Sequence, residues 1–424
     1  MAHYKKLLVI AGAAALLTAC GGSSSSSGKK TNDNSSNTPT AIGVLSDSPV
    51  DGVGYQTSSG KTGTTQDGGK FNYTLGDTVT FTLGEFILGS YKPTRADETV
   101  TPIELTHAIS DTTQRDFAVT NLLVLLQSLD EDGDPNNGIT INAGVTFSAD
   151  SLTLIDDPAT FATNQDLIDA LPEGGTVVSP EDANAHFNAQ RAKDLAGIYY
   201  ASDFHAVLRI NSDRGYIVGQ LKEEDGAMGI EVGNLTWDVK TGEVRDIEVS
   251  LDTQTNHYGE TGGVAGLDNA DDLLFKPTQT ELLITDGDED FVFKRFVPAT
   301  GNNIVGAWAA NLDGIDSPET SLNTYQFIFF DNGTYAMLDP IGDMDPEEDS
   351  CSGPGVEAGH YTVSAGKINL SDLIVDTNGC GGLHDFDDET FNTPIPFSIE
   401  GDIMSWNLGD EGIFQLKRIS TLVN

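Results

Sequence analysis

The sequence predicts a mainly β protein, with an α+β N-terminal domain (a small β-sandwich plus helices) followed by two tandem antiparallel β-barrel or sandwich repeats. Three observations support this fold class. Short alternating apolar runs, separated by Gly, Asn and Asp turns, fill most of the chain. Runs with helical character lie together between residues 117 and 195. Five motifs then recur in the same order in the second half of the chain.

Length and composition set the number of domains that we expect. A chain of 424 residues corresponds to about three domains at roughly 150 residues each. The 38% hydrophobic content is enough for packed cores, and three cysteines exclude a cysteine-rich scaffold. The predicted order is a signal peptide at 1–19, a lipidated flexible tether at 20–40, the β-sandwich plus helical domain at 41–178, a connecting helix at 179–196, and β-repeats at 197–298 and 304–420.

The N-terminus has the features of an export signal. A short apolar run, residues 7–19, follows Lys5 and Lys6 and is too short to span a bilayer. The run leads into Leu17-Thr18-Ala19-Cys20, which resembles the lipobox of bacterial lipoproteins. The resemblance implies cleavage before Cys20 and acylation of that cysteine, so that lipid holds the protein on a membrane.

The segment after Cys20 predicts how the protein is placed in the cell. Residues 21–40 contain no large apolar residue, which is typical of a flexible tether. In lipoproteins of enteric bacteria an aspartate after the lipidated cysteine favours inner-membrane retention, and Gly21 stands there instead. We therefore expect a lipid-anchored protein of a Gram-negative cell envelope, at the outer membrane rather than the inner one.

The first folded segment opens with turn and strand signals. Asp67-Gly68-Gly69 predicts a tight turn, while Lys70–Tyr73 and Thr78–Leu83 alternate as strands. The opening Pro49-Val50-Asp51-Gly52 and the hairpin at 65–71 resemble carboxypeptidase-regulatory-like β-sandwich modules. The resemblance covers about 45 residues at the start of the segment. It implies a structural or adhesive module rather than a catalytic one.

The pattern then changes to helices. Phe117–Leu129 is apolar almost all round and predicts a buried helix. The longer run at 121–139 is similar to a segment of uncharacterised proteobacterial lipoproteins, a similarity that implies no activity. A short helix is expected at Gln165–Leu171. A further helix is expected from the N-cap Ser179 to Leu195, with proline at its first position.

The best metal candidate is the acidic run after the buried helix. Asp130, Asp132 and Asp134, with Asn136, place oxygen ligands at the short spacing that Ca²⁺ prefers. The run departs from an EF-hand because Pro135 stands where a glycine is required. A calcium loop and a solvated acidic turn that caps the helix both stay open, so calcium is the one cofactor considered.

The second half of the chain contains an internal repeat. Two of the intervals between matched motifs agree within two residues, which favours true repetition over chance. Each copy has short alternating strands with Gly, Asn and Asp turns, as in an antiparallel sandwich or barrel. The matched segments are 197–199 with 306–308, 213–216 with 331–335, 229–233 with 355–359, 251–253 with 375–377, and 293–295 with 416–418.

The ends of each copy carry a second resemblance. Gly306-Ala307-Trp308 on the first strand and a basic residue on the last strand resemble the lipocalin-like barrels, in which a Trp packs near an Arg of the closing strand. The resemblance implies that Trp308 pairs with Arg418, and that Tyr199 pairs with Arg295. The loop motifs of that family are not evident in this sequence. The alternative is an aromatic first strand that only packs in a core.

Two cysteines remain besides Cys20, and both lie in the second copy. Cys351 and Cys380 have no cysteine counterparts in the first copy. Because an exported lipoprotein reaches an oxidising compartment, we expect these two residues to form a disulfide. Closing a loop of about 30 residues would contribute roughly 3–4 kcal/mol in the chain-entropy treatment.

Charge and missing motifs argue against several functions. The formal net charge of −43 disfavours nucleic acid binding, because phosphate needs a basic face. Nucleophile-elbow, zinc-protease, phosphate-loop and dinucleotide motifs are absent from the sequence, and no histidines pair at zinc-ligand spacing. We therefore predict no catalytic residues and no enzyme. A hydrolase is the least favoured alternative, because the 65 acidic residues make any choice of a catalytic pair arbitrary.

Two non-enzymatic functions remain. The first is a membrane-anchored lipoprotein that binds or hands on an apolar ligand, a fatty acid or hydrocarbon, in envelope uptake, with an outer-membrane channel as partner. The alternative is a surface or periplasmic interaction module for adhesion or envelope assembly. The barrel-like repeat slightly favours the first, since small barrels can enclose apolar ligands. The residues predicted to line such a cavity are Tyr325, Phe327 and Phe329, with Val207 and Ile217 in the first copy.

Overall fold

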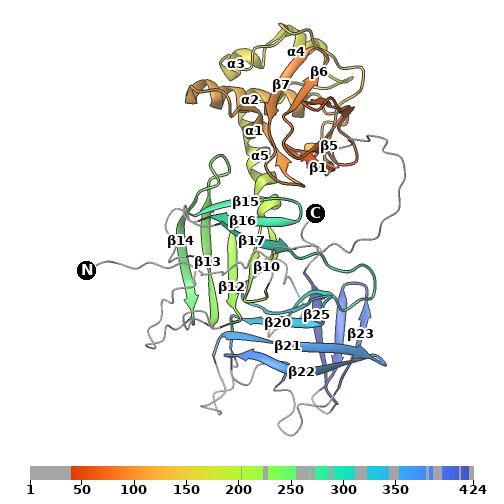
Figure 1. Cartoon of the computed structure of the whole chain (residues 1–424), viewed down its shortest axis with the longest axis vertical. Coiled ribbons are helices and arrows are strands. Elements are labelled where there is room, and N and C mark those ends of the chain that lie inside the picture. The colour runs from red at the N-terminus through yellow and green to blue at the C-terminus, as the bar shows by residue number, and fades with distance from the viewer. Residues whose placement is uncertain are drawn as a thin grey trace, which may run out of the picture. The chain divides into compact units, whose positions relative to one another are not determined.

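The computed structural model divides the chain into two compact units, one that ends at Pro180 and one that begins at Glu181. Strands predominate, and helices accompany the small sheets of the first unit, so the predicted fold class is confirmed (Figure 1). The structure describes residues 40–201, 203–222, 228–254, 267, 273–285, 290–310, 322–342, 353–378, 382–384, 394–409 and 412–419.

Short strands form three small sheets in the first unit. Their orders are β5-β1-β8, β4-β3-β6-β7 and β2-β9. Phe71 on β5 meets Phe81 on β6 edge-on, with ring centroids 5.0 Å apart, so two of these sheets share an aromatic core. The strands are β1 Thr40–Leu45, β2 Val50–Asp51, β3 Gly54–Thr57, β4 Thr62–Thr64, β5 Lys70–Thr74, β6 Val79–Leu83, β7 Phe86–Tyr91, β8 Thr99–Val100 and β9 Ile139–Thr140.

The helices lie close to where the sequence predicts them. The buried helix α2 begins earlier than expected because the Asp111 side chain caps it, accepting the Gln114 N–H at 2.9 Å. Helix α4 ends two residues before the predicted Leu171. Helix α5 has the predicted extent. The helices are α1 Pro102–Thr106, α2 Thr112–Ser128, the 3₁₀ turn Pro135–Asn137, α3 Pro158–Phe161, α4 Gln165–Asp169 and α5 Pro180–Leu195.

After α5, the second unit contains an eight-stranded antiparallel sheet, which we call the open barrel. Its order is β14-β13-β12-β11-β10-β17-β16-β15. The edge strands β14 and β15 approach each other at the bridge between Glu243 and Leu274, where the N–H of Val244 donates to the carbonyl of Leu273 at 2.8 Å and that of Phe275 donates to the carbonyl of Gly242 at 2.7 Å. The strands are β10 Gly197–Ala201, β11 Ala206–Ile210, β12 Gly215–Gln220, β13 Gly229–Trp237, β14 Val244–Asp252, β15 Leu274–Pro277, β16 Glu281–Thr285 and β17 Asp290–Arg295.

The rest of this unit is a closed antiparallel barrel of eight consecutive strands, which we call the closed barrel. Its strands are arranged in the same order along the chain as those of the open barrel. Its first strand pairs with its last. Matched motifs of the repeat therefore fall on equivalent strands. The strands are β18 Gly306–Ala310, β19 Tyr325–Phe329, β20 Thr334–Asp339, β21 Gly355–Ser364, β22 Lys367–Asp376, β23 Ile395–Glu400, β24 Ile403–Asn407 and β25 Ile413–Arg418.

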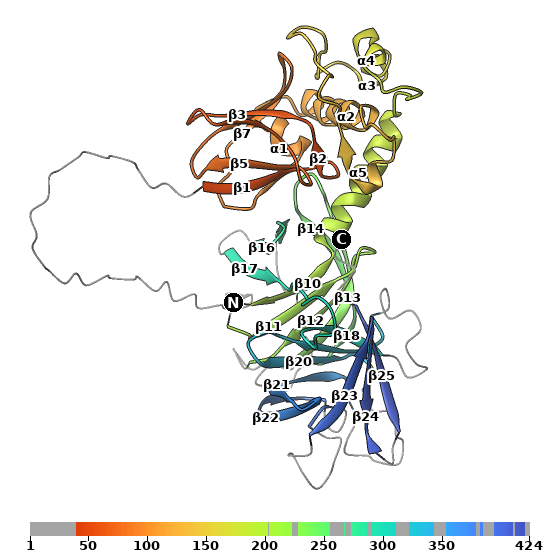
Figure 2. The ribbon, with the colours of Figure 1, turned by 90° about the vertical axis from the view of Figure 1, so that its right-hand side faces the viewer.

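The two barrels pack against each other through one shared core. Strands β12 and β13 of the open barrel contact β21 of the closed barrel, and Figure 2 shows the two barrels next to each other. Ile217 and Val232 belong to the same buried cluster as Ile328 and Leu338. Gly219 on β12 lies so close to Leu338 that an added Cβ would stand 2.4 Å from its side chain. The outward faces of the first strands in each barrel are therefore buried as fully as the inward faces.

Candidate functional site

In each barrel an arginine of the last strand lies over an aromatic ring of the first strand. Arg418 pairs with Trp308 in register, and its guanidinium lies 4.0 Å from the ring centroid. Arg295 pairs with Tyr199, at 4.9 Å. Both predicted pairs are confirmed. Each adds a cation–π contact at the seam where the first and last strands meet.

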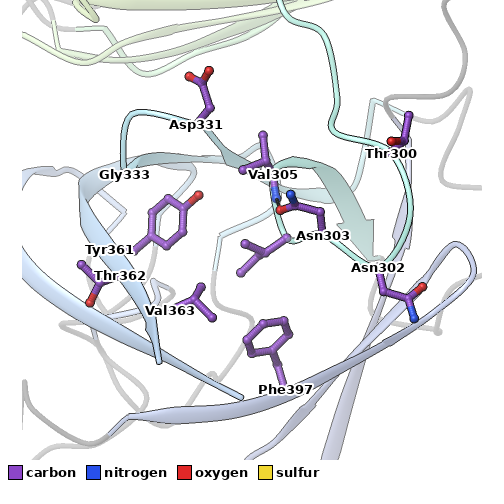
Figure 3. A pocket seen from close by; sticks show the side chains of 11 residues that line it. Thr300, Asn302, Asn303, Val305, Asp331, Gly333, Tyr361, Thr362, Val363 and Phe397 are labelled. Atoms are coloured by element: carbon purple, nitrogen blue, oxygen red, sulfur yellow. Dashed lines mark hydrogen bonds between the residues drawn. The ribbon is translucent and has the colours of Figure 1, made fainter. Parts of the chain in front are cut away.

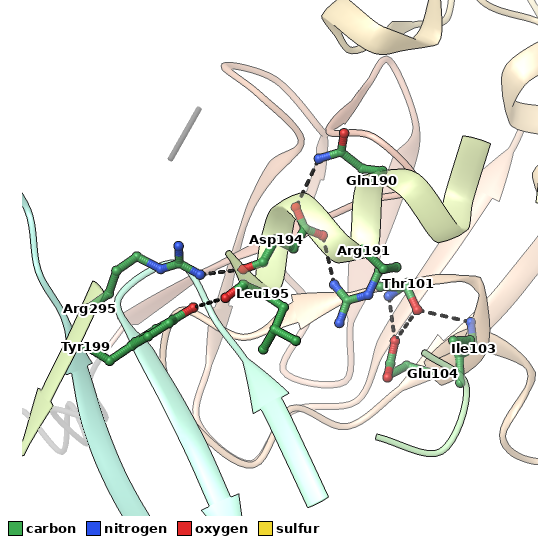
Figure 4. Close-up of polar contacts among 9 residues, drawn as sticks. All are labelled: Thr101, Ile103, Glu104, Gln190, Arg191, Asp194, Leu195, Tyr199 and Arg295. Atoms are coloured by element: carbon green, nitrogen blue, oxygen red, sulfur yellow. Dashed lines mark hydrogen bonds and ion pairs between the residues drawn. The ribbon is translucent and has the colours of Figure 1, made fainter. Parts of the chain in front are cut away.

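In the open barrel this seam also holds the end of α5. The Tyr199 hydroxyl donates a hydrogen bond to the carbonyl of Leu195 at 2.8 Å. The Arg295 guanidinium donates to the carbonyl of Asp194 (Figure 4). It also donates to the carbonyl of Ala196 at 2.8 Å. Carbonyls at a helix C-terminus lack partners within the helix, so the arginine satisfies groups that burial would otherwise leave costly.

The closed barrel repeats the arrangement without a helix. The Trp308 indole N–H donates to the carbonyl of Ile304 at 2.9 Å. The Arg418 guanidinium donates to the carbonyls of Gly301 and Asn303, at 3.3 and 3.0 Å. The carbonyls of the segment before the first strand thus accept hydrogen bonds from the same two seam side chains in both barrels, although only one of the two segments is helical.

The glycine that begins each first strand makes room for this arginine. A Cβ on Gly306 would stand 2.6 Å from a terminal guanidinium nitrogen of Arg418, and one on Gly197 would stand 2.9 Å from Arg295. Real Cβ atoms do not approach heavy atoms so closely. The Gly-x-aromatic motif of the repeat therefore has a steric cause.

A buried glutamate occupies the same position in both barrels. Glu231 on β13 and Glu357 on β21 are fully buried. The Tyr216 hydroxyl donates to Glu231 at 2.7 Å, and the N–H of Leu267 donates to the same oxygen at 3.0 Å. These bonds offset the large cost of removing a carboxylate from water.

Glu357 has the equivalent partners. The Tyr335 hydroxyl donates to it, as do the N–H groups of Leu383 at 3.1 Å and His384 at 3.4 Å. In both barrels the glutamate therefore binds the segment that follows the fifth strand. In the sequence, the Gly-x-Glu-x-Gly motif at residues 229–233 and 355–359 indicated only the repeat. Its alternation, with Gly and Glu on one face and apolar residues on the other, was the available signal for an inward glutamate.

One end of the closed barrel carries an open hollow of about 640 Å³. Figure 3 shows the side chains of Tyr361, Val363 and Phe397 directed into it. The volume lies in the range of roughly 300–1,000 Å³ that is typical of ligand sites. The hollow is lined by Thr300, Asn302, Asn303, Ile304, Val305, Asp331, Gly333, Tyr361, Thr362, Val363 and Phe397.

The polar groups nearest the centre of the hollow already have partners. The Tyr361 hydroxyl donates to the carbonyl of Phe330 at 2.7 Å. Burial raises the pKa of Tyr361 to about 12, and the charge of Asp331 adds to this, so the phenol stays neutral at physiological pH. The Asn303 side chain accepts the N–H of Val305 at 3.0 Å. The hollow therefore offers an occupant an apolar, aromatic centre within a polar rim.

The predicted lining residues of the second copy lie inside the closed barrel. Phe327 and Phe329 belong to the buried cluster that fills its interior, together with Trp308 and Trp406. Tyr325 packs against this cluster at the edge. An eight-stranded barrel is just wide enough for side chains to fill it. These aromatic residues therefore pack against one another.

The predicted lining residues of the first copy lie elsewhere. Val207 and Ile217 face out of the open barrel and belong to the core shared by the two barrels. Leu208, not Val207, is opposite Tyr199, as Phe327 is opposite Trp308. The sequence assignment was one residue out of register on β11, and such a slip moves a side chain to the other face of a strand.

The acidic run after α2 forms a compact turn. Asp130 is buried and accepts an N–H of β9 at 2.9 Å; burial raises its pKa, and the neighbouring Asp132 adds to this. Asp132 accepts the N–H of Asp134 and the side-chain amide of Asn137, at 2.9 and 3.0 Å. Asp134 accepts both amides of Asn136. Side-chain oxygens of all three aspartates thus accept hydrogen bonds from nearby residues of the chain. Calcium binding stays a prediction.

The remaining predicted sites lie outside the described residues. These are the lipidation site Cys20 and the disulfide partners Cys351 and Cys380. Within the described ranges, no three His, Cys, Asp or Glu side chains gather as metal ligands. The helices in the same ranges include none that is both long and apolar enough to cross a bilayer.

Comparison with known proteins adds no relative: no family model, no curated protein and no solved structure matches this chain.

Proposed function

We propose that this protein is a lipid-anchored, non-catalytic interaction module of the bacterial cell envelope. In this proposal it binds a partner protein at the hollow of the closed barrel. The lipobox and the polar tether support the anchoring. An envelope channel, the partner class that the sequence suggests, would be one such protein.

The observation that carries the proposal is the contrast between the interior of the closed barrel and its end. The interior is filled by its own aromatic side chains. The hollow instead leaves Val363 about 46% exposed beside Phe397. An apolar centre with a polar rim is the usual anatomy of a protein interface. Binding at this end requires no rearrangement of the packed core.

Site-specific photo-crosslinking in the producing bacterium tests the proposal. A photoreactive amino acid replaces Val363 in the hollow or Ile413, a control residue on β25 of the same barrel that is 70% exposed. We expect a discrete crosslinked envelope protein from position 363 and none from position 413. Identical crosslinking from both positions, or none from either, would contradict the proposal.

A second candidate function is binding of an apolar small molecule in the same hollow. The apolar side chains of Ile304, Val363 and Phe397 favour it. The net charge of −43 and the rim residue Asp331 disfavour a fatty-acid carboxylate and favour a neutral ligand such as a hydrocarbon. Native mass spectrometry of residues 21–424, purified without detergent from cells supplied with hydrocarbons, distinguishes the two. A bound neutral molecule that Val363→Asp removes would support this second function.

A further inference from the structure

The turn after α2 contains a buried carboxylate that the chain's own hydrogen bonds satisfy only in part. Asp130 is 2% exposed, and its Oδ1 accepts the N–H of Thr140 at 2.9 Å. Its Oδ2 is also buried and has no hydrogen-bond partner among the described residues. Because burying an ionised carboxylate is costly unless it is paired, this oxygen indicates a partner of positive charge.

A second carboxylate lies against the first. The side chain of Asp132 is in hydrogen-bond contact with that of Asp130, but when both are ionised it offers a further negative oxygen and no donor. Helix α2 ends two residues before Asp130, at Ser128, so the negative end of its dipole adjoins the pair. One cation between the two carboxylates would offset all three sources of negative charge.

An exposed amide adds a third group to this pair. The Asn137 side-chain amide lies 3.0 Å from Asp132 Oδ2, on the 3₁₀ turn that begins at Pro135. A half-turn of the amide exchanges its nitrogen for its oxygen, so the same group can ligate a cation. Asp134 is engaged elsewhere, because its Oδ1 accepts both amides of Asn136. The fold therefore brings together two carboxylates and one amide.

We infer that Asp130, Asp132 and Asn137 bind Ca²⁺, with water completing the coordination. Ca²⁺ takes about six to eight oxygen ligands in flexible geometry, whereas Mg²⁺ requires a near-ideal octahedron. Asp132 and Asn137 are exposed, so a hydrated ion can approach from the solvent side of the turn. Because only two ligands are charged, we expect a dissociation constant on the order of 0.1–1 mM. The inference goes beyond the proposed function and does not depend on the hollow.

Calcium at this place would join two elements of the first unit. Asp130 follows α2, and its Oδ1 already accepts from Thr140 on β9, the strand that pairs with β2. A cation on Oδ2 would link the same side chain to Asp132 and Asn137. We therefore expect calcium to reduce local opening of the turn, which is observed as slower amide exchange at residues 129–141.

Two measurements on residues 21–424 test the inference. Calorimetric titration with CaCl₂ gives the affinity, in about 0.3 M KCl to screen weak attraction to other acidic groups. Hydrogen exchange detected by mass spectrometry, in the same buffer with about 5 mM CaCl₂, locates the site. We expect slower exchange at residues 129–141 with CaCl₂ and little change with the same concentration of MgCl₂.

Two variants of similar shape and a control give the decisive comparison. Asp132→Asn removes a charged ligand from an exposed position and should weaken binding about tenfold or more. Asp130→Asn keeps the acceptor for Thr140, and its new amide can donate to Asp132. This variant should lose the calcium-dependent protection yet melt no lower than the unmodified chain in calcium-free buffer. Asp150→Asn removes the same charge from an exposed turn of the same unit and should leave the affinity within about twofold.

Three results would overturn the inference. The first is an unmodified chain without calcium-dependent protection at residues 129–141. The second is unchanged protection in Asp132→Asn, and the third is an equal loss in Asp132→Asn and Asp150→Asn, which general attraction of calcium to an acidic chain would produce. Equal protection by MgCl₂ would overturn the choice of calcium. Circular dichroism verifies that each variant is folded, and the exposed position of Asp132 keeps the test readable should Asp130→Asn fail to fold.

Discussion

The open and the closed barrel have the same strand order, the same arginine over an aromatic ring and the same buried glutamate, yet their ends differ. The open barrel receives a helix, and its edge strands meet at one bridge. The closed barrel receives a non-helical segment, and its strands form a continuous ring. The comparison teaches that the same seam forms whether a helix or a non-helical segment precedes the first strand.

The largest expected effect breaks the seam of the closed barrel. Trp308→Ala removes a fully buried ring, its N–H bond to Ile304 and its contact with Arg418. We expect the free energy of unfolding to fall by about 3–5 kcal/mol in urea denaturation. Tyr199→Phe keeps the ring in the open barrel and removes only the bond to Leu195, which should cost about 1 kcal/mol. Equal losses would mean that the Tyr199 hydroxyl stabilises its seam far more than one ordinary hydrogen bond does.

The next effect compares the buried glutamates. Glu357→Ala removes an acceptor used by Tyr335, Leu383 and His384, and we expect a loss of about 2–3 kcal/mol in the same assay. Glu231→Ala removes the acceptor used by Tyr216 and Leu267, and we expect a loss of similar size, about 2–3 kcal/mol. A clear difference between the two losses would show that the two carboxylates do not stabilise their barrels equally.

The smallest effect concerns the hollow itself. Because the folded state raises the pKa of Tyr361 to about 12, from an ordinary value near 10, its contribution to stability is complete below pH 10 and is lost as the pH rises toward 12. Asp331→Asn should lower this pKa but leave it above 10, since burial is the larger cause. Ultraviolet titration of tyrosinate, with Tyr361→Phe as the reference, measures the shift. An unchanged pKa in Asp331→Asn would remove that carboxylate from the electrostatics of the hollow.

Much of the fold could be predicted from the sequence because its signals are local or repeated. The pairing of Trp308 with Arg418 was expected from the resemblance of the repeat's end motifs to lipocalin-like barrels, and the structure shows it. The N-terminal strands and helices followed from alternation, turns and caps. The first residue of α2 was missed because Asp111 caps the helix before its apolar run begins.

The faces of the strands were harder to predict for a physical reason. Strands such as β11 and β20 are buried at every position, because one face fills a barrel and the other joins the shared core. Alternation then carries no information about which face points inward, and Val207 was assigned to the wrong one. The hollow was missed because its walls come from residues near 300, 331, 361 and 397, which meet only in the folded chain.

The shared core makes each repeat depend on the other to cover an apolar face. Each barrel presents its first four strands to the other, so the contact is self-complementary in the manner of a symmetric dimer. A solitary copy of either repeat would expose that apolar face and need a second copy to cover it. Joining both copies in one chain makes the association independent of protein concentration.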